Sequence, residues 1–321
     1  MKDQFTYSIK KYSEIELAEL AKLSVDVWNA KGNQYTVERY IDWLKNLEFD
    51  FEPKIVVAKK DKQLVGWVML FVHSKTELEL NPFALGGHPF IVTSANKETV
   101  ANNLLKKVID YFNNSNYTRI ELTFDKEDSS DEQLFKKLYD LNQFTLFEQI
   151  CHMRNDLTNS QEYLPQTNLK WEIKPISEVK EDDFLKCIYN VFKNTEDNWM
   201  QSLTDEEIKD NFETRVINRP FKLIEGSSLG LLDNDKLIGF SVVRESHGSK
   251  NGHLWLMGIH SDYRRQGLGS FLIDTMLDNL VKNDYETASL NVDLSNKPAY
   301  DIYKSKGFKE DWVKLCYVLK K

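Results

Sequence analysis

The chain has few cysteines and no long apolar run. Its 321 residues include only three cysteines, Cys151, Cys187 and Cys316, which are far apart and show no metal-binding spacing. We therefore expect buried thiols in a reducing compartment. No apolar stretch approaches the roughly 18 residues that span a bilayer, and the N-terminus shows no secretory signal. The sequence thus predicts a cytoplasmic protein that does not engage a membrane.

An excess of positive charge is also absent. Lys and Arg number 42 against 50 Asp and Glu, which gives a formal net charge of −8 at pH 7. A nucleic-acid binder needs a basic face to displace counterions from phosphates, so nucleic acid is not expected as a partner. An acidic surface attracts cationic substrates, although mild acidity often serves solubility alone.

Histidines at metal-ligand spacing are missing as well, and we expect no metal. The six histidines are His73, His88, His152, His247, His253 and His260.

The chain does contain enough apolar residues to form two hydrophobic cores. It is 41% hydrophobic and contains 7 Trp, 14 Tyr and 18 Phe, which excludes an intrinsically disordered chain. At about 100–200 residues per domain, its length suggests two domains.

An internal repeat supports this division. Val57–Met69 resembles Leu231–Val243, and both segments are typical of a strand, a polar turn and a second strand. The equivalent glycines, Gly66 and Gly239, lie 173 residues apart (239 − 66), about half the chain. A tandem duplication requires such a spacing.

Apolar periodicity predicts the same order of elements in both halves. In the second half we expect strands at Trp171–Ser177, within the hairpin Ser228–Glu245, and at His253–Ile259, Ala288–Leu294 and Val313–Leu319, with helices at Glu181–Asn194, Asp205–Val216, Leu268–Asn283 and Pro298–Lys306. In the first half we expect strands at Phe5–Lys11, within the hairpin Ile55–His73, and at Arg119–Phe124 and Thr145–Arg154, with helices at Glu14–Asn29, Val37–Leu47, Glu98–Asn113 and Asp131–Asn142. This order indicates an α/β (α+β) fold with mixed sheets.

The join between the halves is expected in a polar stretch. We expect a first domain at residues 1–156, a linker at residues 157–168 and a second domain at residues 169–321.

A glycine-rich turn between a predicted strand and a predicted helix is the most informative feature. It carries the pattern R-x-x-G-x-G at Arg264, Gly267 and Gly269. A helix N-terminus exposes unpaired N–H groups and carries about half a positive charge, which suits a pyrophosphate. The glycines let the backbone approach the phosphates, and Arg264 and Arg265 are placed to neutralise their charge. An ordinary helix N-terminus with solvated arginines is the alternative.

A second motif downstream favours the anion-binding interpretation. Asn296 to Phe308 has the pattern N-x-x-A-x-x-x-Y-x-x-x-G-F. With this motif and the turn in this order, residues Trp171 to Lys320 resemble the GNAT superfamily of acyl-CoA-dependent N-acyltransferases. The resemblance implies two tandem GNAT-like domains, each a mixed, mostly antiparallel sheet flanked by helices, and acetyl-CoA as cosubstrate.

The resemblance also implies roles for individual residues. Met257, Gly258 and Ile259 match the strand whose backbone pairs with the pantetheine arm, and Asn296 matches a side chain that contacts this arm. Tyr303 matches the general acid that reprotonates the departing thiolate. The phosphate cradle corresponds to Arg264, Arg265, Gln266, Gly267, Leu268, Gly269 and Ser270.

Direct transfer to an amine requires its neutral form. An amine with a pKa of about 10.4 is neutral only about one part in 10³ at pH 7, so desolvation or a base must help. Asn291 stands where some relatives carry a glutamate, so that base is missing. The candidates for a base are Glu245, His247, His253 and Asp293.

Tyr303 raises a related question of proton affinity. A phenol of pKa near 10 donates a proton to a thiolate of pKa near 8.5 at a cost of about 2 kcal/mol. Either its pKa is lowered, or the hydroxyl hydrogen-bonds the sulfur while the ammonium product supplies the proton.

The first half lacks this turn. Its corresponding segment, Pro89–Ala101, has no glycine in the turn and no arginine. We therefore expect a GNAT-like half that has lost acyl-CoA binding. By resemblance to tandem GNAT proteins of the mycothiol synthase type it shapes the acceptor pocket; a purely structural role is the alternative.

The leading hypothesis is an acetyl-CoA-dependent N-acetyltransferase that acts on a primary amine of a small molecule. A peptide or protein N-acetyltransferase is the second hypothesis. A non-catalytic acyl-CoA sensor is the third, because no base is evident. A tandem aminoacyl transferase that uses charged tRNA fits less well, because such proteins are not expected to keep this phosphate loop. The acceptor and the oligomeric state are not written in the sequence.

Overall fold

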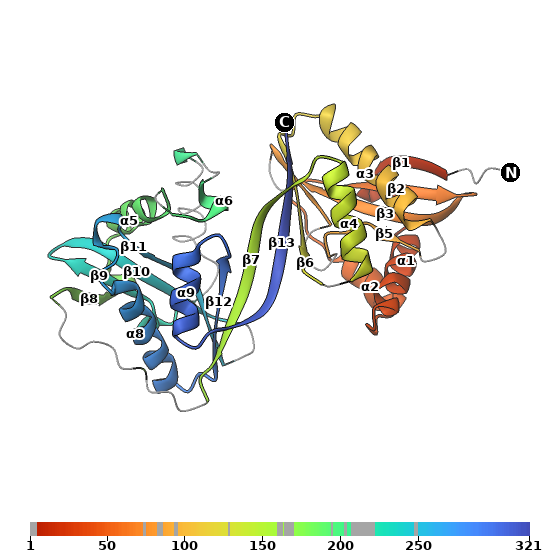
Figure 1. Ribbon diagram of the computed structural model, residues 1–321. Coiled ribbons are helices and arrows are strands. Elements are labelled where there is room, and N and C mark those ends of the chain that lie inside the picture. Colours follow the sequence, from red (N-terminus) through yellow and green to blue (C-terminus); the bar gives the residue numbers. More distant parts are fainter. Residues whose placement is uncertain are drawn as a thin grey trace. The chain divides into compact units, whose positions relative to one another are not determined.

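The computed structural model shows a chain that forms two compact units, each described here by itself (Figure 1). Unit 1 contains Met1–Phe147 and Lys314–Lys321, and unit 2 contains Glu148–Val313. The structure describes residues 5–72, 75–81, 86–92, 96–127, 129–158, 163, 170–193, 195–201, 204–206, 222–246 and 250–321. The expected linker at residues 157–168 stays a prediction, because most of it lies outside these ranges.

Unit 1 is a sheet flanked by helices. Its strands are β1 (Phe5–Lys11), β2 (Lys54–Lys60), β3 (Gln63–Val72), β4 (Glu77–Leu80), β5 (Phe90–Ile91) and β6 (Arg119–Asp125), and its helices are α1 (Leu17–Ala30), α2 (Val37–Lys45), α3 (Lys97–Asn113) and α4 (Ser130–Leu141). The sheet order is β1-β2-β3-β4-β6-β13, and only the β4–β6 pair is parallel.

Unit 2 repeats this design. Its strands are β8 (Glu172–Pro175), β9 (Leu229–Asp233), β10 (Lys236–Glu245), β11 (Asn251–Ile259) and β12 (Thr287–Asp293), and its helices are α5 (Glu181–Lys193), α6 (Asn198–Gln201), α8 (Leu268–Lys282) and α9 (Lys297–Ser305). The sheet order is β7-β12-β11-β10-β9-β8, and only the β11–β12 pair is parallel. The expected mixed, mostly antiparallel sheets are thus confirmed.

Two long strands contribute residues to both units. These are β7 (Thr145–Asp156) and β13 (Lys309–Lys320). The end of β13 pairs with β6 in unit 1, with Val318 opposite Glu121, while β7 pairs with β12 in unit 2, with His152 opposite Asn291. The last strand of each half therefore enters the sheet of the other half's unit.

Helices cover both faces of the unit 2 sheet because successive strand residues point to opposite sides. On β10, Ile238 packs with Leu268 and Leu272 of α8, whereas the preceding residue, Leu237, packs in the cluster that contains the buried residues of α5. The buried residues of α5 are Phe184, Cys187, Ile188 and Val191, the i, i+3, i+4, i+7 spacing of one helical face. All three cysteines are free and buried, as expected.

Most expected elements are found within a few residues of their predicted bounds. The helix expected at Asp205–Val216 lies mostly outside the described residues, and α6 precedes it. Strands β4 and β5 were not expected, because they are only four and two residues long. None of the described helices combines the length and the apolar character needed to cross a membrane.

The position of β13 predicts that the C-terminus stabilises unit 1. Val318 is 3% exposed, so Val318→Asp places an unpaired charge in the core at a cost of several kcal/mol. We expect amide hydrogen exchange at Ile120 and Leu122 to accelerate by at least tenfold, although they lie about 200 residues earlier.

The matched control is Lys320→Gln, a substitution at an exposed position of the same strand. It should leave exchange in β6 unchanged. Unaltered protection of β6 in the Val318→Asp variant would contradict the assignment of β13 to this sheet.

Candidate functional site

The site begins where two parallel strands separate. Pairing between β11 and β12 runs from Asn251 opposite Thr287 to Leu254 opposite Leu290 and then stops. Yet β11 continues to Ile259 and β12 to Asp293. No strand among the described residues lies between the facing edges of these extensions, so their backbone groups are available to a ligand.

A pocket of about 530 Å³ lies at this separation. All of the site residues expected from the sequence line it, with the exception of Gln266. These are Met257, Gly258, Ile259, Arg264, Arg265, Gly267, Leu268, Gly269, Ser270, Asn296 and Tyr303. The pocket is also lined by the end of α5, by residues 195–197, by Met200 of α6 and by Asn291, Val292 and Asp293 of β12. The two sequence motifs therefore meet at one cavity.

A β-bulge interrupts β11 beside the pocket. Val243 pairs with Leu254 and Val242 with Leu256, so Trp255 is the extra residue. A bulge leaves one residue outside the ladder and re-aims the backbone. Because Trp255 lines the pocket, this irregularity lies at its wall.

The glycine-rich turn has the backbone of an anion site. Gly267 is the N-cap of α8 with φ +80°, which favours glycine, and Arg265 has φ +60°. In the described part of the chain, no side chain caps this helix, and a Cβ at Gly267 would meet no atom within 4 Å. The first N–H groups of α8, on Leu268, Gly269 and Ser270, therefore face open space at the positive end of the helix.

The two arginines of the turn have different surroundings. The Arg264 side chain donates hydrogen bonds from Nε to the Ile259 carbonyl at 3.1 Å and from Nη2 to the Val191 carbonyl at 2.9 Å. Arg265 lines the pocket with an exposed side chain. The expected phosphate-neutralising role thus suits Arg265, whereas Arg264 ties the turn to β11 and α5.

The end of α5 is fixed against the pocket by further contacts. A Cβ at Gly258 would clash with the Val191 side chain, so glycine is needed there for close helix–strand packing. The Asn190 side chain accepts a hydrogen bond from the Ser261 N–H at 3.0 Å. The end of α5, from which the chain leads to α6, is therefore held against β11 and against the start of the segment that leads to the glycine-rich turn.

Tyr303 stands in the pocket wall on α9. It is 7% exposed, its ring packs edge-on against Phe308, and its hydroxyl forms no hydrogen bond with a described residue. Burial raises the pKa of the Tyr303 hydroxyl above its usual value. The alternative of a lowered pKa is therefore wrong for the protein alone, and the hydroxyl is a hydrogen-bond donor that keeps its proton.

Asn296 is the N-cap of α9. Its Oδ1 accepts a hydrogen bond from the Ala299 N–H at 3.4 Å, and Pro298 lies in the first turn, as the sequence predicted. The cap uses Oδ1, so any contact with a ligand falls to the amide Nδ2.

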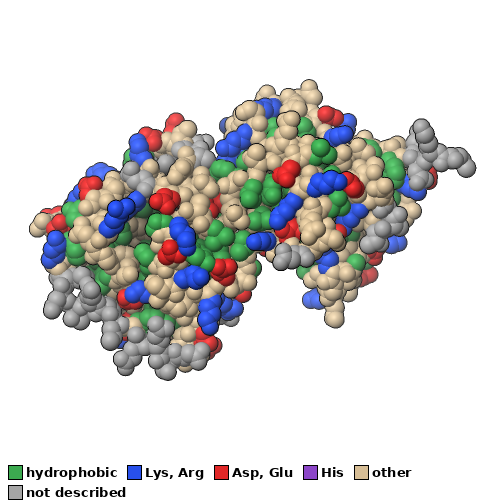
Figure 2. Space-filling view, viewed as in Figure 1, with side chains coloured by type: hydrophobic (Ala, Val, Ile, Leu, Met, Phe, Trp, Pro, Cys, Tyr) green, Lys and Arg blue, Asp and Glu red, His purple; other side chains and the backbone are tan. Residues whose placement is uncertain are grey.

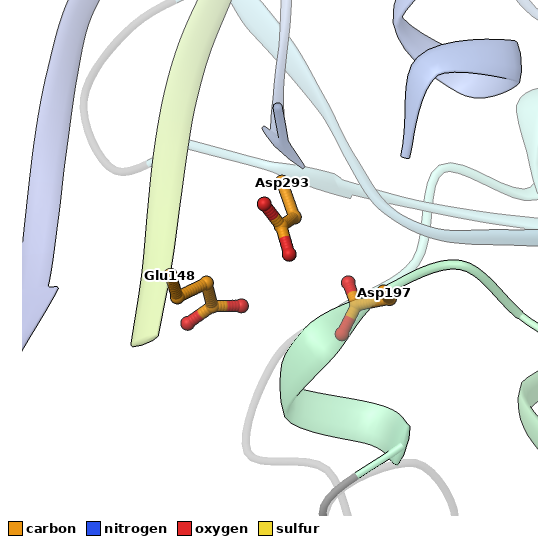
Figure 3. A group of neighbouring side chains, drawn as sticks. All are labelled: Glu148, Asp197 and Asp293. Carbon is orange, nitrogen blue, oxygen red and sulfur yellow. The ribbon is translucent and has the colours of Figure 1, made fainter. Parts of the chain in front are cut away.

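Three carboxylates meet beside the pocket. Glu148 of β7, Asp197 just before α6 and Asp293 at the end of β12 point toward one another, with carboxylate oxygens within 4.8 Å (Figure 3). Asp293 accepts hydrogen bonds from the N–H and hydroxyl of Ser295 and from the Asn198 N–H. Such a group attracts cations. The expectation that no metal is bound stays a prediction.

Sequence reasoning named Asp293 but missed its two neighbours. Glu148 lies in a segment assigned by sequence order to the first half, and only the β7–β12 pairing brings it into unit 2. Asp197 accepts a hydrogen bond from the Met200 N–H at 2.9 Å, so its local signature is that of a helix cap.

Two of the other candidate bases, His253 and Glu245, are not among the residues that line the pocket. His253 is buried on β11, hydrogen-bonds Ser289 through Nδ1, and burial lowers its pKa to about 4. A base that weak does not deprotonate an ammonium group. Glu245 is exposed on β10, and His247 lies outside the described residues. Asp293 is the candidate that the structure places at the pocket.

The surface carries both signs of charge. On the described residues of the face shown in Figure 2, Lys and Arg alternate with Asp and Glu, and no large region of one sign is seen.

Comparison with known proteins shows a likeness to one family over the part of the chain that contains this pocket. Residues 188–308 match the model of the Acetyltransferase (GNAT) family, which confirms the resemblance inferred from the two motifs. The chain is 32% identical over 87 residues to the ribosomal protein bS18-alanine N-acetyltransferase of Escherichia coli. That match covers 27% of this chain and 57% of the relative, so the chain spans just over half the length of the curated relative it matches.

Solved structures extend the likeness to both units. A GCN5-related N-acetyltransferase from Sphaerobacter thermophilus is similar with a TM-score of 0.62 at 13% identity, covering 98% of this chain and 95% of that one. A tandem GNAT protein from the clavulanic acid biosynthesis pathway gives a TM-score of 0.60 at 11% identity, covering 99% and 98%. At these identities the likeness shows a tandem GNAT fold.

The two arginines of the turn should differ in their contribution to stability. Arg264→Met removes both hydrogen bonds to backbone carbonyls, and we expect a loss of about 1–2 kcal/mol, seen as a lower Tm. Arg265→Met keeps the positive φ and removes only a solvated charge, so Tm should remain within error. Equal Tm values for the two variants would refute the structural role of Arg264.

Proposed function

We propose that this chain is an acetyl-CoA-dependent N-acetyltransferase whose reaction takes place in unit 2, with a primary amine as acceptor. The observation that carries the proposal is the pocket at the β11–β12 separation. It reaches the open N-terminus of α8, the Tyr303 hydroxyl and two carboxylates of the acidic group. One cavity thus offers an anion site, a backbone edge, a hydroxyl donor and an attraction for cations.

The pyrophosphate of acetyl-CoA fits the N-terminus of α8. Its charge is met by the helix dipole and by the N–H groups of Leu268, Gly269 and Ser270. The empty space in front of Gly267 admits the phosphates, and the Arg265 side chain neutralises part of their charge from the rim.

The pantetheine arm fits the free edge of β11. Its two amides resemble a short peptide, and Met257, Gly258 and Ile259 have no β12 residue opposite them. The arm then adds a strand to that edge, with main-chain hydrogen bonds that supply affinity. Asn296 lines the same pocket, and its amide nitrogen is a donor for a carbonyl of the arm.

The thioester lies near the bulge at Trp255 in this arrangement. A backbone N–H that has left the ladder can donate to the thioester carbonyl, where negative charge develops during attack. The Tyr303 hydroxyl donates to the sulfur and stabilises the departing thiolate. Because burial raises the pKa of Tyr303, the hydroxyl holds its proton.

The proton balance follows from these roles. The acceptor arrives as an ammonium ion and loses one proton, through water or the carboxylates, to solvent. The neutral nitrogen then attacks the carbonyl carbon, the N–C bond forms, and the C–S bond breaks. The second nitrogen proton moves to the thiolate, so the products are the N-acetyl amine, CoA thiol and one solvent proton.

Two opposed effects act on the pKa of the acceptor amine. The carboxylates Glu148, Asp197 and Asp293 stabilise the ammonium form and raise this pKa, which favours binding. Burial against the apolar lining by Leu254, Met200 and Val292 lowers it, which favours attack. A cation is thus drawn to the acidic group and loses its proton as it enters the pocket.

A small polycationic amine is the acceptor that we favour. Three carboxylates within 4.8 Å exceed the charge of one ammonium group, and a second ammonium group on the same molecule would offset part of the excess. The second candidate is the N-terminal amine of a peptide, favoured by the 32% identity to a ribosomal-protein alanine N-acetyltransferase over 87 residues.

Tyr303→Phe tests the chemical step. Loss of the hydroxyl removes a hydrogen bond that forms fully only as the thiolate leaves, so we expect kcat to fall by about 10²-fold or more. The KM for acetyl-CoA should change by less than threefold. The measurement is CoA thiol release against a panel of amines.

The control for this variant is acetyl-CoA affinity by calorimetry, which should be retained. Unchanged kcat would remove Tyr303 from the chemistry. Binding of acetyl-CoA by the wild type without thiol release with any amine or peptide would favour the sensor hypothesis.

Glu148→Gln tests the acceptor assignment. It removes one charge from the acidic group without changing the shape of the side chain, so the KM for a diamine should rise by about tenfold, or ~1.4 kcal/mol. The KM for acetyl-CoA should be unaffected.

The matched control is Glu245→Gln, the same substitution at an exposed position outside the pocket lining. It should leave both KM values unchanged. A peptide amine acetylated with a lower KM than any diamine, and without response to Glu148→Gln, would replace the polycation by the peptide.

A further inference from the structure

The two units can be aligned residue by residue through their strand registers. In unit 1, Gly66 lies opposite Ile91, and in unit 2, Gly239 lies opposite Ile259. The parallel ladder ends at Leu80 opposite Leu122 in unit 1, and at Leu254 opposite Leu290 in unit 2. Unit 1 therefore contains the same point of strand separation that forms the pocket of unit 2.

The helix that follows carries an equivalent tyrosine. In unit 1 the Phe144 N–H donates to the Tyr139 carbonyl at 3.0 Å, and in unit 2 the Phe308 N–H donates to the Tyr303 carbonyl at 3.1 Å. Both tyrosines are five residues before a buried phenylalanine and lie on the corresponding helix. Tyr139 thus occupies in unit 1 the place of Tyr303 in unit 2.

The strand opposite β3 differs from its counterpart in unit 2. Between the pair Leu70–Leu80 and the pair Trp67–Phe90, β3 has two residues. The opposite segment has nine residues between the same two pairs, seven more than β3. In unit 2 the excess is the single bulge residue Trp255. Part of this insertion, Gly86 to His88, is described by the structure.

The insertion is fixed at its base by Asn81. The Asn81 carbonyl accepts from the Gly87 N–H at 3.0 Å, its Nδ2 donates to the His88 carbonyl, and its Oδ1 accepts from the Met69 N–H at 2.7 Å. Asn81 is fully buried with φ +40°. These bonds hold Gly87 and His88 beside the sheet.

Gly87 lies directly against β6, just past the end of the parallel ladder. It has φ +69°, and a Cβ there would clash with the carbonyl of Thr123. In register terms Thr123 corresponds to Asn291, which lines the pocket in unit 2. The space beside this strand, which is open in unit 2, is thus filled in unit 1 by the backbone of Gly87, which contacts Thr123.

His88 completes the filling. Its ring stacks on Phe135 at 4.3 Å between centroids, lies 4.2 Å from the ring of Phe124, and its Nδ1 hydrogen-bonds the Tyr139 hydroxyl at 2.8 Å. The hydroxyl equivalent to that of Tyr303 is therefore already engaged. Burial lowers the pKa of His88 to about 3, with Lys31 and Lys97 acting in the same direction, so the ring is neutral at physiological pH.

The helix N-terminus of unit 1 is closed as well. Asn96 caps α3 by accepting from the Thr99 N–H at 3.1 Å, and Lys97 forms an ion pair with Asp131 of α4. The corresponding cap of α8 is Gly267, which has no side chain to do so.

We propose that Gly87 and His88 occupy, in unit 1, the cleft that in unit 2 receives the acyl-CoA arm, so that each chain binds one acetyl-CoA. This inference rests on the proposed function, which supplies the one acetyl-CoA that is bound in unit 2. The sequence indicated a missing phosphate turn, and the structure adds that the cleft itself is occupied. Restoring glycines and an arginine at the turn would therefore not restore binding.

The test combines stoichiometry with the state of His88. Native mass spectrometry and calorimetry of the full chain should give one acetyl-CoA for the wild type and none for Gly267→Glu, whose side chain enters the space in front of α8. His88→Ala should still give one, because the backbone of Gly87 continues to fill the cleft. A circular dichroism spectrum like that of the wild type verifies the folding of each variant.

Two molecules per chain, or binding that survives in Gly267→Glu, would overturn the inference. No binding by the wild type would instead refute the proposed function, and the inference is then decided by NMR. The His88 ring should show no titration between pH 8 and 5 and should give contacts to the Phe135 ring. Titration near pH 6.5 would show an open cleft and overturn it.

Discussion

The early end of one parallel ladder is the constraint on which the site depends. Once β11 and β12 separate after Leu254 and Leu290, the sheet has a gap that no described strand fills, and the groups along both edges must find other partners. The bulge at Trp255, the open cap at Gly267 and the tyrosine of α9 all border this gap. Unit 1 meets the same constraint in the opposite way, by inserting residues that satisfy the edges from within. The two units thus share one fold but satisfy the same unpaired strand edges in different ways.

Much of this could be predicted from the sequence, because it depends on local patterns. Helix and strand periodicity gave nearly all elements, and the two motifs around Arg264 and Asn296 predicted residues that line a common pocket. Both motifs are short and encode backbone geometry directly: positive φ at Gly267, and a capped helix start at Asn296. The likeness of residues 188–308 to a known family has the same origin.

What could not be predicted depends on pairing between distant segments. Nothing near Glu148 indicates that β7 joins β12, so its place beside Asp293 was not foreseen. Arg264 and Arg265 are neighbours of the same type. Only three-dimensional packing decides that Arg264 donates hydrogen bonds to carbonyls of α5 and β11, whereas Arg265 has an exposed side chain at the pocket. The insertion after β4 was overlooked because its glycines are typical of any turn, and its role follows from contacts with β6 and α4.

The pairing of β13 with β6 has a consequence for the synthesis of the chain. Ile120 and its partner Leu319 are 199 residues apart (319 − 120), which at about 5–20 residues per second separates their synthesis by roughly 10–40 s. Throughout that interval β6 presents an edge without its antiparallel neighbour, and such edges are sites of aggregation. Unit 1 therefore leaves the ribosome before unit 2, but its sheet is completed only after the residues of β13 have been made.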